Sequence, residues 1–315
     1  MTDIDLREAA PAATTIHVIT GEPAAPRSTP SSKGSLLRKL GSPDDVRRLV
    51  TQLLLTFALT CLGFIVFVGY LSGFPQKRAQ NGLERALAVR FRTDKAYIGG
   101  SIPSGTPIAR IDIPRLHLHQ VVVEGTSADN LRLGPGHLLV TPLPGQPGNA
   151  VLAAHRWAFG GPFSTINSLR KGNDIDVVTG QGSFIYKVVG WRTVSSGDVS
   201  SFQATNDNRL TLVTAANLSA SQRWVVTAEL SGDPQPAPSG RPRVLSSRDG
   251  GLVGQHGVLP AVALWVEVLL LTAVGTVVLY RALPRWSSYL ITTPVVLAAL
   301  WLVFANLARL LPATL

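Results

Sequence analysis

The side chains best suited to covalent or metal chemistry are few in this chain, which has 1 cysteine and 6 histidines. The cysteine, Cys61, lies in the middle of a long apolar run, where we expect it to pack as a small side chain. Being alone, it excludes an intramolecular disulfide and a metal site built on cysteines. His117 and His119 alternate within a β-rich run and are expected to face the same side of a strand, but no third ligand accompanies them. The sequence therefore predicts neither a metal site nor a cofactor.

The apolar residues are concentrated in three runs that are long enough to cross a membrane. The composition is 45% hydrophobic with a mean hydropathy of +0.23, which is too apolar for an ordinary soluble protein. The first run, 49–71, contains 23 residues without a charge, against the roughly 20 that a spanning helix needs. It is longer than the apolar region of a signal peptide and no cleavage site follows it, so we expect an uncleaved anchor. The runs 258–280 and 289–307 are separated by a short polar turn and predict a hairpin of two transmembrane helices.

The turn of this hairpin predicts the orientation of the chain in the membrane. Arg281 and Arg285 lie in a connection too short to be anything but a turn, and Lys and Arg in short flanks prefer the cytoplasm. The first helix has basic residues on both sides and decides little. We therefore expect a multi-pass protein of the cell membrane, with residues 75–257 in an extracytoplasmic domain.

Composition divides the rest of the chain into four segments. Residues 1–48, rich in Ala, Pro, Ser and Thr, predict a disordered cytoplasmic tail. A membrane-proximal connector is expected at 72–106. Between 107 and 231, short β-rich runs separated by Gly, Pro, Asn and Asp predict a closed all-β domain. Residues 232–257, rich in Pro, Gly and Ser, predict a linker back to the membrane.

The net charge of +10 and the pI near 10.3 raise the question of nucleic-acid binding. The basic residues are spread through tails, flanks and loops, and no stripe of Lys and Arg is interleaved with aromatic residues. No nucleic-acid partner is predicted. The charge suits a solvated surface, or attraction to the lipid membrane or to an acidic cell-wall polymer.

Several linked motifs follow one another in the all-β segment. They stand in the order IDIPRLHLHQVVVEGT, LRLGPGHLLVTPLPGQPGNAVLAAHR, GPFSTINSLRKGNDIDVVTGQGSFIYKV, TLVTA and QRWVVTAEL. Together these motifs resemble the catalytic domain of sortases, over about 125 of the 315 residues. This resemblance implies an eight-stranded β-barrel of the all-β class that cuts a sorting signal and joins the product to an amine, usually on the cell wall or a pilin.

The resemblance also implies three catalytic side chains. A cysteine thiolate attacks the threonine carbonyl of the signal, a histidine protonates the leaving amine, and an arginine holds the substrate carbonyl. His155 matches the histidine and Arg223 matches the arginine. The cysteine should close the TLxTC strand, but this strand ends in Ala215. The nucleophile is therefore missing.

A methyl group cannot form an acyl-enzyme, and three explanations stay open. The chain is a natural pseudoenzyme, or it uses Ser219, Ser221 or Thr214 as an unorthodox nucleophile, or Ala215 is an engineered substitution in an active cysteine transpeptidase. The favoured hypothesis is a non-catalytic protein that binds an extended sorting-signal peptide or an envelope partner in surface-protein or pilus assembly. A third class, a structural subunit of a membrane complex, predicts a groove filled by side chains or by the loop between Ala215 and Arg223.

The last five residues, Leu311–Leu315, read LPATL and resemble the start of a sortase recognition motif. The apolar stretch and basic tail that follow such a motif are missing here. The match is short and it directly follows the third apolar run, so the sequence favours coincidence.

Overall fold

The computed structural model describes residues 43–242, 256–282, 284–312 and 314. The chain divides into two compact units, Met1–Thr56 and Phe57–Leu315. The predicted disordered tail lies outside the described residues up to position 42, and so does 243–255 of the predicted linker.

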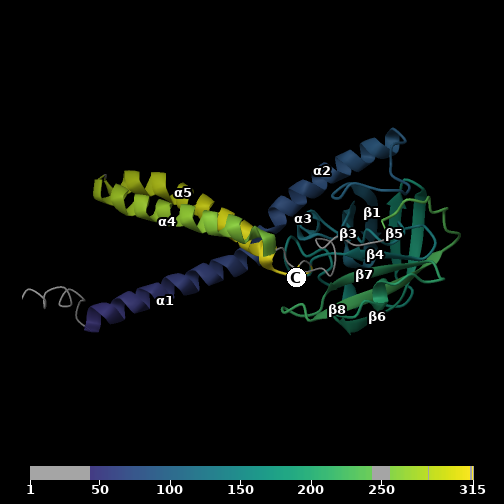
Figure 1. Ribbon diagram of the computed structural model, residues 1–315, viewed down its shortest axis with the longest axis horizontal. Helices are drawn as coiled ribbons and strands as arrows, with labels where there is room; N and C mark the ends of the chain where they lie inside the picture. The colour runs from purple at the N-terminus through teal and green to yellow at the C-terminus, as the bar shows by residue number, and fades with distance from the viewer. Residues whose placement is uncertain (1–42, 243–255, 283, 313, 315) are drawn as a thin grey trace, which may run out of the picture. The chain divides into compact units, whose positions relative to one another are not determined.

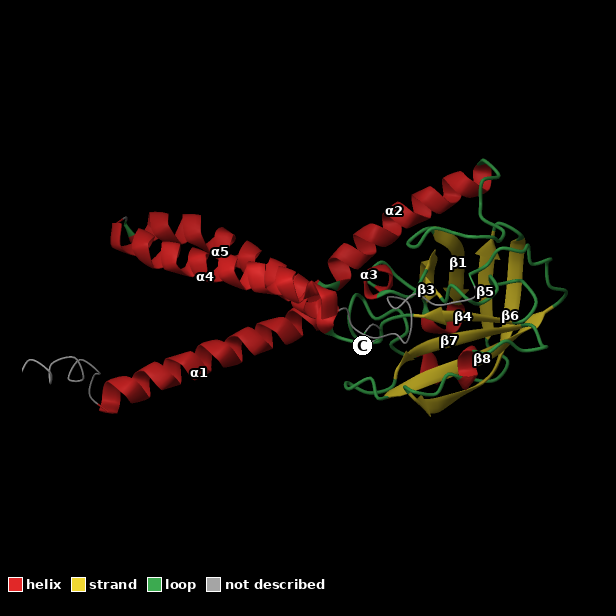
Figure 2. Ribbon diagram, viewed as in Figure 1, coloured by secondary structure: helices red, strands yellow, loops and turns green. Residues whose placement is uncertain are grey.

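Among the described residues, three helical stretches are long and apolar enough to cross a membrane: Val46–Arg92, Leu259–Ala282 and Trp286–Leu310. The second of these is helix α4, and no residue of it is fully buried in the protein. A long apolar helix without a fully buried residue is suited to hydrocarbon rather than to water. The longer helices are α1 (Pro43–Val66), α2 (Gly73–Arg92), α4 (Leu259–Ala282) and α5 (Arg285–Leu307), with a π-helical turn (Phe67–Leu71), the short helix α3 (Ala128–Leu131) and a 3-10 turn (Ala308–Leu310) (Figures 1 and 2).

The strands of the described residues form one closed barrel in the order β1-β2-β3-β4-β7-β8-β6-β5, which confirms the predicted eight-stranded fold. Most neighbours are antiparallel, but β2 pairs with β3 and β4 pairs with β7 in parallel. A parallel pair ends at a single edge of the barrel, so residues that follow β4 and β7 come close together. The strands are β1 (Pro107–Ile113), β2 (Leu118–Glu124), β3 (Gly136–His137), β4 (Asn149–Ala153), β5 (Asp174–Thr179), β6 (Gly182–Ser195), β7 (Arg209–Ala215) and β8 (Gln222–Ser231) (Figure 2).

Strands β4, β7 and β8 are buried on both faces. Leu152 of β4 and Leu212 of β7 belong to the large cluster inside the barrel. Their sequence neighbours Ala153 and Val213 belong to a second cluster, because successive side chains of a strand point to opposite faces. The second cluster lies on the outer face of these strands and forms the floor of the cavity described below.

A third apolar cluster joins the long apolar helices to the loop that follows β4. Phe67, from the π-helical turn, makes an edge contact with Trp301 of α5 at a ring-centroid distance of 4.9 Å and a tilted contact with Phe304 of α5 at 5.8 Å. Phe159, in the loop after β4, packs in the same cluster, and its backbone N–H donates to Ser72 Oγ at 2.8 Å. The helix ends therefore support this loop directly.

Candidate functional site

Three neighbouring strands bring the backbone at His155, Ala215 and Arg223 to one edge of the barrel. Strands β7 and β8 pair Ala215 with Arg223 directly opposite each other. The last registered pair between β4 and β7 joins Ala153 to Val213, and His155 lies in the loop that follows β4. The N–H of the next residue, Arg156, and the N–H of Ala215 both lie within 3.4 Å of the Thr314 carbonyl oxygen, so the backbone at His155 is close to Ala215. The predicted site residues thus form one row, although His155 and Ala215 are far apart in the sequence.

The loop after β4 holds His155 in a buried position, with 3% of the residue exposed. Its ring packs on Phe159 with centroids 4.9 Å apart and planes at 52°. Its carbonyl accepts the N–H of Phe163 at 3.1 Å. Phe159 has a positive φ of 49°, a strained conformation for a bulky residue that persists where tertiary packing determines it. The position of His155 therefore depends on the junction with the membrane helices.

Arg223 is buried as well, with 5% of the residue exposed, and its guanidinium lies 5.8 Å from the centre of the Phe202 ring. Burial lowers the pKa of Arg223 below its ordinary value. The side chain nevertheless stays charged near neutral pH, because arginine titrates far above it. A desolvated guanidinium in an apolar setting favours a carbonyl or an anion as a ligand.

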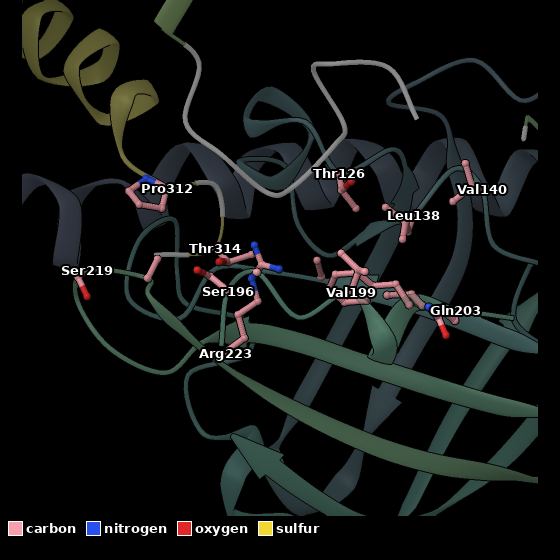
Figure 3. A pocket seen from close by; sticks show the side chains of 15 residues that line it. Thr126, Leu138, Val140, Ser196, Val199, Gln203, Ser219, Arg223, Pro312 and Thr314 are labelled. Atoms are coloured by element: carbon pink, nitrogen blue, oxygen red, sulfur yellow. The ribbon is translucent and has the colours of Figure 1, made fainter. Parts of the chain in front are cut away.

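A cavity of about 680 Å³ opens beside this row, within the size range of ligand pockets in proteins. Figure 3 shows Arg223 directed toward Thr314 at one end of the cavity, with Val140 and Gln203 at the other. His155 and Ala215 are not among its described lining residues. The lining residues are Thr126, Leu138, Val140, Val151, Ala153, Ser196, Gly197, Val199, Phe202, Gln203, Ser219, Ala220, Arg223, Pro312 and Thr314.

The backbone carbonyl of Thr314 lies against the row itself. It accepts the N–H of Arg156 at 3.2 Å and the N–H of Ala215 at 3.4 Å, and the Thr214 hydroxyl is 3.5 Å away. Arg156 stacks on Trp224 of β8, with its guanidinium carbon 3.7 Å from the ring centre, and donates from Nη1 to the carbonyl of Ala216. The sequence reading missed both Arg156 and Thr314, although Arg156 directly follows the histidine that the motif singled out.

The alternative nucleophiles have local hydrogen-bond partners. Thr214 Oγ1 donates to the carbonyl of Ala154 at 2.8 Å. The Ser219 and Ser221 hydroxyls lie 2.9 Å apart, and both bond to the side chain of Asn217 within the turn between β7 and β8. These contacts organise the turn, and they direct the hydroxyl groups toward one another.

The expected strand alternation of His117 and His119 is wrong. His117 precedes β2 and caps a 3-10 turn with a positive φ of 50°, so the two side chains do not share a strand face. His119 Nδ1 instead lies 2.8 Å from Asp112 Oδ1 on β1. Within the described ranges, no group of three or more His, Cys, Asp or Glu residues is arranged around a common point that could hold a metal ion.

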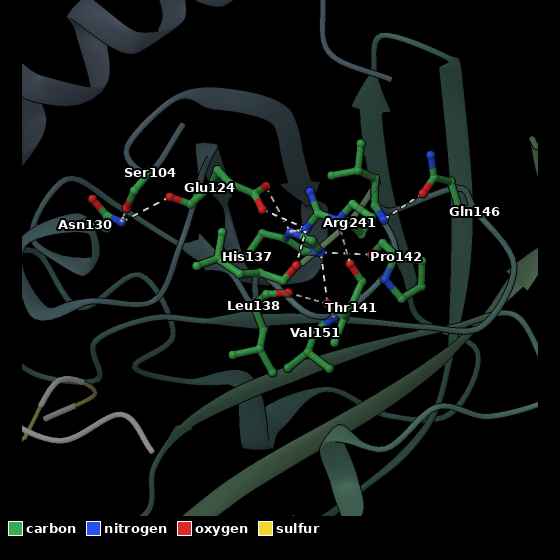
Figure 4. A network of polar contacts seen from close by, with 12 residues as sticks. Ser104, Glu124, Asn130, His137, Leu138, Thr141, Pro142, Gln146, Val151 and Arg241 are labelled. Carbon is green, nitrogen blue, oxygen red and sulfur yellow. Dashed lines mark hydrogen bonds and ion pairs between the residues drawn. The ribbon is translucent and has the colours of Figure 1, made fainter. Parts of the chain in front are cut away.

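A second polar cluster lies at β2 and β3, and Figure 4 shows its side chains converging. Glu124 and His137 are fully buried, with Oε2 and Nδ1 3.1 Å apart. Arg241 donates from Nη2 to Glu124 Oε1 at 2.7 Å and to the carbonyl of Leu139 at 2.9 Å. Burial alone would raise the pKa of Glu124, but the charges and hydrogen bonds of His137 and Arg241 outweigh it and hold this pKa below its ordinary value. Arg241 belongs to the predicted linker, so this part of the segment is bound to the barrel.

Comparison with known proteins agrees with the motifs. Residues 111–231 match the family model for the sortase domain. Sortase D of Bacillus subtilis is 30% identical over 126 residues, which are 39% of this chain and 62% of that protein. Sortase SrtE1 of Streptomyces coelicolor is 30% identical over 166 residues, 50% of this chain and 47% of that protein. The chain thus spans about half to three fifths of the length of these relatives. A solved Clostridium perfringens sortase D5 transpeptidase is similar over 50% of this chain and 98% of its own, with 26% identity and a TM-score of 0.43.

Proposed function

We propose that the chain, whose residues 111–231 match the family model for the sortase domain, is a membrane-anchored, non-catalytic binder of an extended peptide. The peptide is a sorting signal or a segment of an envelope protein that takes part in surface-protein or pilus assembly. The membrane helices hold the domain at the outer face of the cell membrane. The positive charges of Arg281 and Arg285 in the hairpin turn support this orientation.

One observation carries the proposal: Ala215 stands directly opposite Arg223, beside an open cavity of about 680 Å³. The methyl group of Ala215 cannot attack a carbonyl, so the step that needs a nucleophile is lost. The cavity and its buried guanidinium are nevertheless retained, and these are the features that bind and orient a peptide. A purely structural subunit would not need an open cavity of this size.

A second candidate, a cysteine transpeptidase with Ala215 in place of its nucleophile, is supported by the intact row. A thiol at position 215 would attack a threonine carbonyl and form a C–S bond while the following C–N bond breaks. The leaving amine would take its proton from His155, and a second amine would then displace the thiol. Ala215 is the only member of this row that lacks the required chemistry.

The test uses the full chain in detergent and fluorescent sorting-signal peptides, including one with the sequence of residues 308–315. Because Pro312 and Thr314 line the cavity, each protein is also prepared with residues 311–315 replaced by Gly-Ser-Gly-Ser-Gly. We expect reversible binding by this tail-replaced chain, weakened about tenfold by Arg223→Ala, or roughly 1.4 kcal/mol. The matched control Arg115→Ala removes an exposed arginine and should leave the affinity unchanged.

Ala215→Cys separates the two candidates. If the Ala215→Cys variant forms a hydroxylamine-sensitive thioester with a peptide and the parent chain only binds the peptide reversibly, the result supports an inactivated transpeptidase. Reversible binding by both proteins without a thioester supports the non-catalytic binder. Failure of the parent, the Ala215→Cys variant and both tail-replaced forms to bind any peptide overturns both candidates.

A further inference from the structure

We propose that the segment 311–315, called here the tail segment, is an intramolecular ligand of the same chain, held through Pro312 and Thr314 at one end of the peptide cavity. The proposal rests on the proposed function in one respect only, because it takes the cavity to be a peptide site. It assigns the first occupant of that site, and it makes access for any other peptide depend on release of the tail segment.

The contacts at Thr314 carry the inference. Two backbone N–H groups, that of Arg156 in the loop after β4 and that of Ala215 at the end of β7, converge on its carbonyl oxygen at 3.2 and 3.4 Å. Backbone donors that converge on one oxygen fix the register of a bound chain, and they do so whatever its side chain. The second donor belongs to the residue at the nucleophile position. The Thr314 carbonyl is therefore held where a sorting signal would present the carbonyl that is attacked.

The burial and conformation of the described residues of this segment, Leu311, Pro312 and Thr314, fit a bound ligand. Thr314 is 1% exposed, and both Pro312 and Thr314 line the cavity. Leu311 has φ −65° and ψ 152°, which is extended backbone. The proline at 312 restricts φ before binding, so less conformational entropy is lost when the segment is bound.

The chain that precedes the tail segment is fixed by apolar packing and by an ion pair. Phe304 and Ala308 are buried in the cluster with Phe67 and Phe159. Arg309 Nε lies 3.4 Å from Asp129 Oδ1, beside the barrel. A short tether to a fixed point gives an effective concentration in the millimolar range. The tail segment should therefore compete strongly with a free peptide of micromolar affinity.

The sequence alone favoured coincidence for the LPATL match, because a five-residue match is short. The structure adds the position of the threonine carbonyl beside Ala215. The groups that bind this carbonyl belong to Thr214 and Ala215, about 100 positions earlier in the chain, and to Arg156, about 160 positions earlier. Motif and placement together point to self-recognition.

The first experiment measures occupancy directly, without any added peptide. In full-length protein carrying Cys61→Ser and Ala215→Cys, we measure the rate at which a maleimide labels the introduced thiol. Replacement of residues 311–315 by Gly-Ser-Gly-Ser-Gly should raise this rate by on the order of tenfold. A matched protein with Cys61→Ser and Ser183→Cys, which places the thiol at an exposed position on β6, should label at the same rate with either tail. Equal rates at position 215 with both tails would overturn the proposal.

The second experiment leaves Ala215 in place and measures competition. A labelled peptide with the sequence of residues 308–315 is titrated into the full chain and into the tail-replaced chain. We expect about tenfold tighter binding by the tail-replaced chain, because the intramolecular competitor is gone. Equal affinity for both chains, with unchanged labelling, overturns self-occupancy and leaves the proposed function standing. Faster labelling after tail replacement without binding of any peptide supports self-occupancy and overturns the proposed function.

Discussion

His137 on β3 and His155, which follows the neighbouring strand β4, are both buried, but their surroundings differ. Each ring nitrogen of His137 has a polar partner, Glu124 Oε2 at 3.1 Å and the Pro142 carbonyl at 2.8 Å. The ring of His155 packs against the ring of Phe159, and the row to which His155 belongs borders a cavity. The cluster at His137 is saturated by the protein itself and stabilises the fold. The row at His155 borders space that a peptide can enter, so it is the cavity that distinguishes a candidate site from a structural cluster.

The largest expected effect is the loss of stability on breaking the saturated cluster. Arg241→Ala leaves Glu124 buried without its guanidinium partner, and such losses cost about 3–5 kcal/mol. Thermal unfolding of the full chain should shift down by several degrees. If the melting temperature falls only as much as it does for an exposed ion pair, Arg241 is dispensable for stability. The cluster at His137 would then not be a structural one.

Acid should weaken the same cluster. The folded state lowers the pKa of Glu124, so its stabilising contribution is present above the ordinary value of 4.5 and is lost as pH falls through the folded pKa. We expect the melting temperature to fall below about pH 4.5, and to fall less steeply in Glu124→Gln. Parallel pH profiles for the two proteins would contradict this assignment.

The row that contains Arg223 and the cluster that contains Arg241 should respond in opposite ways when peptide binding and stability are measured together. In the tail-replaced chain, Arg223→Ala should weaken peptide binding about tenfold, or roughly 1.4 kcal/mol. Arg241→Ala should leave the affinity unchanged at a temperature where the protein is still folded. If Arg241→Ala weakens binding as much as Arg223→Ala does, the two clusters act as one site.

A smaller effect is expected from the stiffness of the tail segment. Pro312→Gly leaves the Thr314 carbonyl in place but increases the freedom of the unbound tail, a difference of about 0.5–1 kcal/mol. The apparent Kd of a labelled peptide for the full chain should then fall roughly two- to fivefold. No change in Kd would show that Pro312 does not contribute to occupancy.

The smallest effect is expected at an exposed ion pair. Lys187 Nζ lies 2.7 Å from Asp174 Oδ1, the same distance as in the Arg241–Glu124 pair, but its side chains are 57% and 48% exposed. Solvent screens exposed pairs, so Lys187→Ala should cost at most about 0.5 kcal/mol by thermal unfolding. If Lys187→Ala lowers stability as much as Arg241→Ala does, burial is not what makes the Arg241–Glu124 pair more stabilising.

Much of the candidate site could be predicted from the resemblance to sortases. The resemblance identifies His155 in AAHR, Arg223 in SQRW and Ala215 at the end of TLVTA, because each match lies in a short local motif. Arg156 was adjacent to a chosen residue and was still missed, since its role rests on stacking with Trp224. Arg241 was assigned to a linker because its neighbours are Pro, Gly and Ser, and composition does not reveal a buried carboxylate elsewhere in the chain.

The sequence by itself determined the apolar helices, the closed barrel and the absence of a thiol from the domain. These properties follow from residue type and local periodicity, which depend only on residues that are close together in the sequence. Only the tertiary structure decided that Arg241 reaches Glu124 across 117 positions and that the Thr314 carbonyl meets the N–H of Ala215 about 100 positions away. Such contacts depend on how strands close into a barrel and where a helix ends against it, and no local pattern of residues encodes that geometry.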